Sequence, residues 1–171
     1  METEKWFDEN EKEIIREPVK DENLECIAEL GGNFEEFNVG INFYSKNIDR
    51  EEITNLLEHN PTKAWNAGER HPIGNSGKTR ITDWGKWLLW AGRNATDVNI
   101  KLRNLFKDLT DDLDKWQKLT SKYESWVEVA GYMDNWNRGF MLDADILKLL
   151  SDRNLKIYFD IYYYEDEDKD E

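Results

Sequence analysis

Residues 37–44 carry an apolar side chain at every second position, and this alternation is the strongest local constraint in the chain. The apolar positions are Phe37, Val39, Ile41 and Phe43, and between them lie Asn38, Gly40, Asn42 and Tyr44. Successive side chains of a β-strand point to opposite faces, so the pattern predicts a strand with one buried face. The rest of the chain must then supply a layer that covers this face.

Two short helices are predicted from their capping residues. Asp49 followed by Glu52 forms an acidic capping box ahead of an apolar stripe, and Pro61 requires the helix to end before it. Asp143 is the expected N-cap of the second helix, which Asn154 ends in a left-handed turn.

A longer amphipathic segment lies between these two helices. Apolar residues recur at intervals of three and four from Val98 to Leu119, which predicts one long helix or two helices broken near Thr110. The opposite side of this segment mixes both charges, and its residues, Lys101 among them, are expected to be exposed.

Three more segments have strand patterns: Thr79 to Ala91, residues 126–132 and residues 155–164. Strands with one polar face favour a sheet covered mainly from one side. We therefore expect an α+β fold, with an antiparallel or mixed sheet of four to five strands and helices packed mainly on one face.

The expected domain organisation has three parts. Residues 1–33 are an acidic N-terminal arm, with a possible edge strand at 24–30, residues 34–164 form a single α+β domain, and residues 165–171 are an acidic tail. A domain of this size buries a sizeable core without disulfides. The single cysteine, Cys26, cannot form an internal bridge.

The net charge of −14 is concentrated in the two ends of the chain. Residues 1–33 hold 4 basic and 11 acidic side chains, residues 34–159 hold 18 and 19, and residues 160–171 hold 1 and 7. This distribution argues against direct nucleic-acid binding, which needs clustered Lys and Arg. It leaves open a basic protein partner attracted by the acidic ends, or ends that serve only solubility.

The composition favours a cytoplasmic protein without a membrane segment. The first residues lack the basic and apolar regions of a signal peptide, and no apolar run approaches the roughly 20 residues that span a bilayer.

No motif in the chain specifies a reaction. Residues 73–79 end in Gly-Lys-Thr, but Pro72 stands where a P-loop needs glycine, and the segment leads into a strand. His59 and His71 are too far apart in sequence to form a zinc motif, and no nucleophile is marked out beside them. We expect a protein that is not an enzyme and has no cofactor or metal, with His71 exposed in a loop.

Two candidate contact surfaces remain. The first is the connection from Asn60 to Thr82, because Arg and Trp are enriched at binding hot spots. Its candidate residues are Trp65, Arg70, His71, Lys78 and Arg80. The second is the polar side of the last strand, with Tyr158, Tyr162 and Tyr164. The alternatives are a loop that closes the sheet and a tyrosine face covered by the N-terminal arm.

The segment from about residue 37 to 163 resembles the bacterial domain of unknown function family 4279. The resemblance depends on residues 49–57, on Pro61-Thr62-Lys63-Ala64-Trp65 with Gly68-Glu69, on residues 84–90, and on Asp160-Ile161-Tyr162 after Gly139-Phe140-Met141-Leu142. It implies a small intracellular bacterial domain similar to the immunity proteins encoded beside toxins, and it supplies no catalytic residues.

Three functions follow as hypotheses. The first is a non-enzymatic immunity protein, a monomer or weak homodimer, that binds and neutralises a cognate toxin, with a basic toxin domain as the candidate partner. The second is a small-ligand or enzymatic domain with a pocket beside residues 61–80. The third is a subunit of a larger assembly that pairs through an open sheet edge.

Overall fold

The computed structural model describes residues 6–7, 13–14, 32–74, 76–91 and 97–163. The strands are β1 (Trp6–Phe7), β2 (Glu13–Ile14), β3 (Glu36–Ser45), β4 (Lys63–Trp65), β5 (Arg70–Pro72), β6 (Thr79–Ile81), β7 (Gly85–Trp90), β8 (Glu124–Met133) and β9 (Lys156–Tyr163). The helices are α1 (Arg50–Leu57), α2 (Val98–Phe106), α3 (Leu113–Lys122) and α4 (Ala144–Asp152). The strand expected at 24–30, the tail 165–171 and Tyr164 lie outside the described residues.

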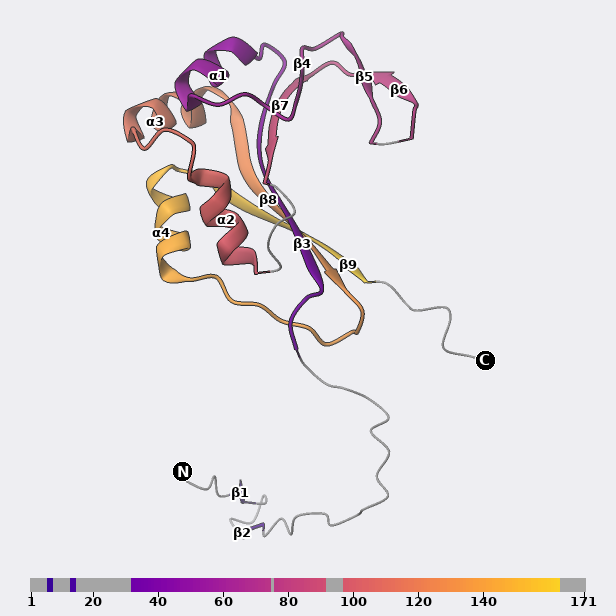
Figure 1. Ribbon diagram of the computed structural model, residues 1–171, viewed down its shortest axis with the longest axis vertical. Coiled ribbons are helices and arrows are strands. Elements are labelled where there is room, and N and C mark those ends of the chain that lie inside the picture. Colours follow the sequence, from indigo (N-terminus) through magenta and orange to yellow (C-terminus); the bar gives the residue numbers. More distant parts are fainter. Residues whose placement is uncertain (1–5, 8–12, 15–31, 75, 92–96, 164–171) are drawn as a thin grey trace.

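Five strands form a mixed sheet in the order β4-β7-β3-β8-β9 (Figure 1). The central strand β3 is antiparallel to both β7 and β8, whereas β9 is parallel to β8. A parallel pair needs a crossover connection, and α4 lies in the connection between these two strands. Strands β5 and β6 pair separately as a hairpin, and β1 pairs with β2. The expected α+β fold with a mixed sheet is confirmed.

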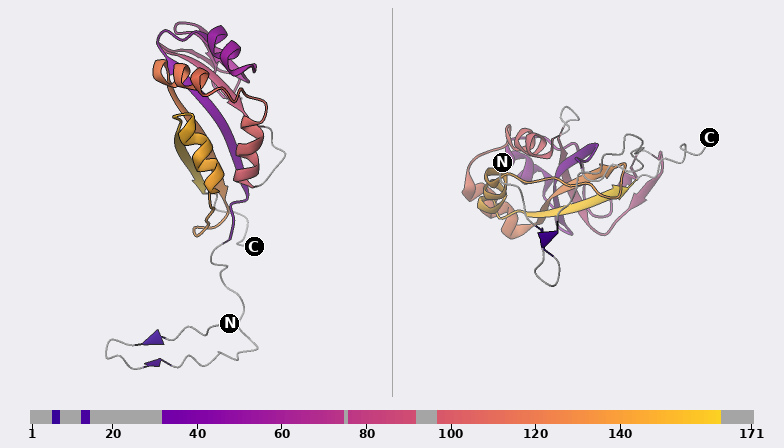
Figure 2. Two further views of the ribbon diagram at one scale, coloured as in Figure 1. Left: turned by 90° about the vertical axis from the view of Figure 1, so that its left-hand side faces the viewer. Right: turned by 90° about the horizontal axis from the view of Figure 1, so that it is seen from below.

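The four helices lie on one side of the five-stranded sheet (Figure 2). The alternating apolar residues of β3 face them and are at most 3% exposed. They join one hydrophobic core with residues of the helices and the neighbouring strands, including Ile53, Trp87, Leu102, Val127 and Ile146. The alternation from Phe37 to Phe43 thus determines which side of the sheet carries the helical layer.

The apolar repeat from Val98 to Leu119 forms two helices, α2 and α3, which is the second of the two expected arrangements. Thr110 lies between them, where its backbone N–H donates to Leu57 O at 3.2 Å and its carbonyl accepts from Trp116 Nε1 at 2.8 Å. The break lets the chain bond to the end of α1. A continuous helix would leave both groups without these partners.

Lys101 is buried, at 2% exposed, so the expectation of an exposed side chain was wrong. Its Nζ donates to the backbone carbonyl of Phe37, under α2. A long lysine stem can pack along apolar surface while its ammonium group reaches a main-chain acceptor. The helical pattern of the sequence gives no sign of a strand carbonyl at that place.

The connection from Asn60 to Thr82, expected as a loop, contains three short strands. Strand β4 pairs with β7, with Ala64 opposite Trp87, and β5 pairs with β6. The strand expected from Thr79 to Ala91 is divided into β6 and β7 at Thr82, whose Oγ1 donates to Trp84 O at 2.7 Å and turns the chain. Three-residue strands are too short to give a periodic signal.

Glu52 joins α1 to α3. Asp49 caps α1 as expected, because its Oδ1 accepts from Glu52 N at 3.0 Å. The Glu52 carboxylate does not complete the capping box and instead accepts from Lys118 Nζ at 3.0 Å, from Lys122 Nζ and from Tyr123 Oη at 2.6 Å. These bonds lower the pKa of Glu52 to about 2, and the bond from Lys122 has the largest effect.

Replacing Glu52 by Gln should make the free energy of unfolding less dependent on pH in the acid range. Because the folded-state pKa is depressed from 4.5 to about 2, the contribution of Glu52 is present above pH 4.5 and lost as the pH falls towards 2. Glu52→Gln should lower the free energy of unfolding by about 1 kcal/mol at pH 7 and flatten its fall in that window. Urea denaturation at several pH values measures both effects.

The exposed neighbour Glu51 provides the control. Glu51→Gln should keep the acid dependence of the wild type. Equal pH profiles for the wild type and Glu52→Gln would contradict the assigned role of Glu52.

Candidate functional site

The side of the five-stranded sheet opposite the helices is called the open face. Its side chains alternate along each strand with those that enter the core. They are Lys63 and Trp65 of β4, Lys86, Leu88 and Trp90 of β7, Asn38, Asn42 and Tyr44 of β3, Trp126, Glu128, Ala130 and Tyr132 of β8, and Tyr158, Asp160 and Tyr162 of β9. Aromatic rings dominate this face and partly bury one another.

Rings on the open face pack against one another. Tyr44 and Trp126 lie parallel, with centroids 4.8 Å apart and an angle of 4° between the planes. Trp65 stacks on His71 at 4.0 Å and 11°, and Trp84 lies 5.9 Å from Trp65 and 4.9 Å from Tyr44. Stacked rings with offset or tilted geometry hold each other rigidly, so this surface is preorganised.

The β5–β6 hairpin reaches the open face through His71. This residue is 2% exposed, so the expected surface histidine was wrong. Nδ1 lies 3.3 Å from Pro72 O and Nε2 lies 3.2 Å from Thr82 Oγ1. With its ring on Trp65 and both nitrogens near oxygen atoms, His71 is a packing residue that holds the hairpin against the sheet.

Lys86 holds a positive charge among these rings. Its Nζ lies 4.8 Å from the Tyr44 centroid and 5.9 Å from that of Trp65. Burial lowers the pKa of Lys86 to about 8, the Glu128 carboxylate opposes this, and the charges of Lys63 and Arg80 add to it. Like charges crowd at this end of the open face, at a cost to stability that a bound anionic group would relieve.

Buried polar atoms on the open face lack hydrogen-bond partners. They are Asn42 Oδ1, Trp65 Nε1 and Trp126 Nε1. Buried polar groups are hydrogen-bonded in the great majority of cases, because an unpaired one costs about 1–3 kcal/mol. Because these three atoms lie beneath the rings, they represent a packing cost of this face.

The predicted contact residues lie in three different settings. Trp65, at 8% exposed, and His71 are buried against each other. Arg70, Lys78 and Arg80 are exposed on the hairpin, with Arg80 Cζ 5.8 Å from the Trp84 ring. Tyr158 and Tyr162 are 54% and 42% exposed on β9, at the other edge of the sheet. The structure therefore brings Trp65, His71 and Arg80 together, while the tyrosines are separate.

Sequence reasoning missed the middle of the open face, formed by Asn42, Tyr44, Lys86, Trp126 and Glu128. A signal was present, because the alternation that buried Phe43 also put Asn42 and Tyr44 on the opposite side. Burial of those polar positions depends on rings from strands distant in sequence, such as Trp126 opposite Asn42.

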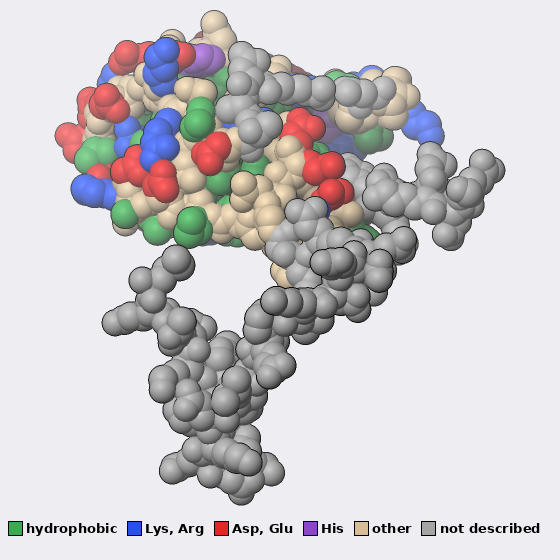
Figure 3. All heavy atoms as spheres, turned by 60° about the horizontal axis from the view of Figure 1, so that its bottom comes forward, with side chains coloured by type: hydrophobic (Ala, Val, Ile, Leu, Met, Phe, Trp, Pro, Cys, Tyr) green, Lys and Arg blue, Asp and Glu red, His purple; other side chains and the backbone are tan. Residues whose placement is uncertain are grey.

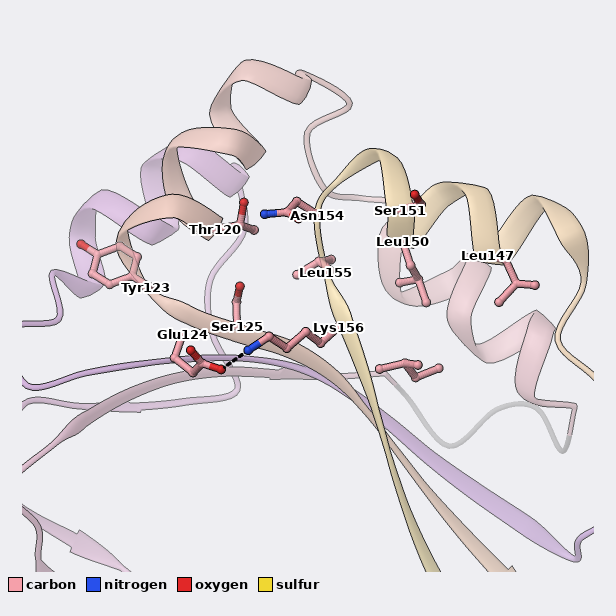
Figure 4. A pocket seen from close by; sticks show the side chains of 11 residues that line it. Thr120, Tyr123, Glu124, Ser125, Leu147, Leu150, Ser151, Asn154, Leu155 and Lys156 are labelled. Carbon is pink, nitrogen blue, oxygen red and sulfur yellow. Dashed lines mark hydrogen bonds and ion pairs between the residues drawn. The ribbon is translucent and has the colours of Figure 1, made fainter.

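A hollow of about 410 Å³ lies away from the open face, between α3, α4 and the starts of β8 and β9 (Figure 4). Leu147 and Leu150 line it from α4, with Ser125 from β8. Its charged groups, Glu124 and Lys156, are paired with each other at 2.5 Å. With no nucleophile activated by a base, this hollow has no catalytic arrangement.

The part of the chain that the structure describes contains no group of three or more His, Cys, Asp or Glu side chains placed to hold a metal ion. It also contains no helix with the length and hydropathy to cross a bilayer.

These features define a small α+β domain with one sheet face packed against helices and the other face rich in aromatic rings. The chain belongs to the family described as a domain of unknown function (DUF4279), whose sequence profile matches residues 35–164. The resemblance inferred for residues 37–163 is therefore confirmed. No curated protein and no solved structure shows significant similarity to the chain.

Replacing Lys86 by Met should stabilise the free protein. Because the folded-state pKa is lowered from 10.5 to about 8, charged Lys86 opposes folding below pH 8, and this cost disappears as the pH rises to 10.5. Lys86→Met should raise the free energy of unfolding by about 1 kcal/mol at pH 7, after discounting for solvent access and the lost ring contacts.

Urea denaturation of both proteins between pH 7 and 10 measures the effect. The difference between them should shrink as the pH rises. A constant difference would show that the charge of Lys86 carries no such cost.

Proposed function

We propose that this protein is a non-enzymatic binding domain that engages a protein partner through its open face. The observation that carries the proposal is a sheet face rich in aromatic rings and without a helical cover, on which Tyr158 and Tyr162 are 54% and 42% exposed. Trp, Tyr and Arg are the residue types enriched at protein-binding hot spots, and preorganised rings lose little entropy on binding.

The local chemistry supports binding better than catalysis. The alternative hypothesis places a catalytic pocket beside residues 61–80. Trp65 and His71 of that segment are buried and stack on each other. Burial lowers the pKa of Lys86, whose ammonium group lies against the Tyr44 and Trp65 rings. The three clustered cations, Lys63, Arg80 and Lys86, are few for phosphate binding against a net charge of −14.

We further propose that the partner is a basic toxin domain, which the protein neutralises in the cytoplasm by occluding its active site. The net charge of −14 attracts a basic protein at long range. On the surface seen in Figure 3 the two signs of charge are interspersed, so the domain body has no single strong field there. The acidic ends steer association, whereas the local charges of the open face, Lys86 near one end and Asp160 near the other, set the orientation.

Removing an exposed ring of the open face should weaken the complex. Tyr158→Ala should reduce affinity about tenfold or more, because truncating a hot-spot aromatic typically costs 1–2 kcal/mol or more. The measurement is co-expression with the product of the neighbouring gene, followed by size-exclusion chromatography and titration of the purified pair.

Leu147 of α4 provides a matched control, because it is 51% exposed on the helical side, against 54% for Tyr158. Leu147→Ala should bind as the wild type does. Loss of binding in Leu147→Ala alone would refute the open face as the contact surface. Failure of the wild type to bind the neighbouring product or reduce its toxicity would count against an immunity function.

The edge strand β9 favours a second candidate function, a subunit of a larger assembly. Large side chains on both of its sides are between 41% and 54% exposed: Tyr158, Phe159, Ile161, Tyr162 and Tyr163. Such an edge can accept a further strand from a second copy of the chain. Light scattering should then show a dimer that Ile161→Lys abolishes, and a strict monomer at high concentration would exclude the homomeric form of this function.

A further inference from the structure

A recess of about 430 Å³ on the open face combines aromatic rings with a carboxylate. Its lining comes from β3, β7, β8 and β9 and consists of Asn38, Trp90, Ala91, Glu128, Ala130, Tyr132 and Tyr162. It contains three aromatic rings and one carboxylate. It lies on the β8–β9 side of the stacked group formed by Trp65 and His71.

Two small residues shape the recess, Gly40 beneath the Trp90 ring and Ala130 in its lining. Gly40 lies opposite Trp90 on one side and opposite Glu128 on the other. A Cβ at Gly40 would stand 2.6 Å from the Trp90 ring, so only glycine lets the indole lie across β3. On the neighbouring strand Ala130 adds a single methyl group. The open space is therefore bounded by the Trp90 ring instead of being filled by a side chain.

Two tyrosines form the opposite wall. Tyr132 and Tyr162 stack with centroids 5.1 Å apart at 15°. Tyr162 Oη donates to Asp160 Oδ2 at 2.5 Å, and Asn38 Nδ2 donates to Tyr132 Oη at 3.3 Å. These bonds fix the orientation of both rings, so the wall keeps its shape without a ligand.

The carboxylate of Glu128 is held in place and keeps acceptor capacity. Its Oε2 accepts from Asn42 Nδ2 at 3.2 Å, while Asn42 itself is completely buried and its Oδ1 has no partner. A carboxylate offers about four acceptor positions. The Glu128 carboxylate acts electrostatically on Lys86, whose ammonium group lies by the Tyr44 ring.

We propose that this recess binds the guanidinium group of an arginine side chain supplied by the protein partner. Aromatic faces attract cations, and a planar guanidinium both stacks on rings and bonds a carboxylate through two parallel N–H groups. Glu128 supplies the carboxylate, and Trp90 with Tyr162 supplies the rings. The inference depends on the proposed function, since a basic partner is what brings an arginine to this face.

The test uses N-acetyl-arginine amide as a probe and N-acetyl-citrulline amide, its neutral counterpart of nearly equal shape. Titration is followed by the NMR shifts of the Trp90 indole N–H and the Gly40 amide in the full chain. The arginine probe should bind with a Kd on the order of millimolar, as expected for a small flexible ligand, and the citrulline probe about tenfold more weakly. Equal binding of the two probes would overturn the proposal.

Glu128→Gln should weaken the arginine probe about tenfold and leave the citrulline probe unchanged. Glu51→Gln, on α1 at the helical side, is the charge-matched control and should bind both probes as the wild type does. If Glu128→Gln keeps wild-type affinity for the arginine probe, the recess is not the site. Unchanged amide spectra away from the recess show that this variant is folded.

The two proposals fail separately. If the protein binds its partner but shows no guanidinium-dependent shift, the recess proposal is wrong and the proposed function stands. If it binds the arginine probe but no basic protein, the proposed function is wrong and the recess proposal stands.

Discussion

Strand β3 is hydrogen-bonded on both edges, to β7 and to β8, and one of its faces is almost completely withdrawn from solvent. The hydrogen bonds on both edges follow from its position at the centre of the sheet, and the buried face follows from its apolar alternation. A shift of one residue in its register would expose Val39 and Ile41 and bury Asn38 on the helical side. The helices, the order of the strands and the composition of the open face all depend on this register.

Because all four helices cover the same face, the other face must complete its packing with side chains alone. Large rings do this by lying along the sheet, as Trp90 does over Gly40 and as Tyr44 does against Trp126. Rings cover area well but satisfy few polar groups. The unpartnered N–H groups of Trp65 and Trp126 are therefore a direct result of building a protein face without a second layer.

Local patterns in the sequence predicted most of the fold and little of the candidate site. The Asp49 cap, the left-handed Asn154 and the long strands depend on neighbouring residues, so they were predicted correctly. His71 and Lys101 were placed wrongly because each is buried by a contact that no local pattern specifies. His71 stacks on the Trp65 ring, which the folding of the β5–β6 hairpin brings to it, and Lys101 reaches the carbonyl of Phe37 in a distant strand. Propensity and periodicity carry no information about such contacts.

The recess illustrates why a binding face is harder to predict than a core. Its shape depends on Gly40 lying between Trp90 and Glu128, residues about 50 and 90 positions away, and on an exact pairing of three strands. The net charge of the chain does not predict the charge of this face either. The chain is acidic as a whole, but Lys63, Arg80 and Lys86 gather at one end of the open face. A partner that fits must therefore match a surface with positive charge near Lys86 and negative charge near Glu128. A merely basic protein satisfies only the second condition, so the local charge pattern confers specificity that net charge cannot.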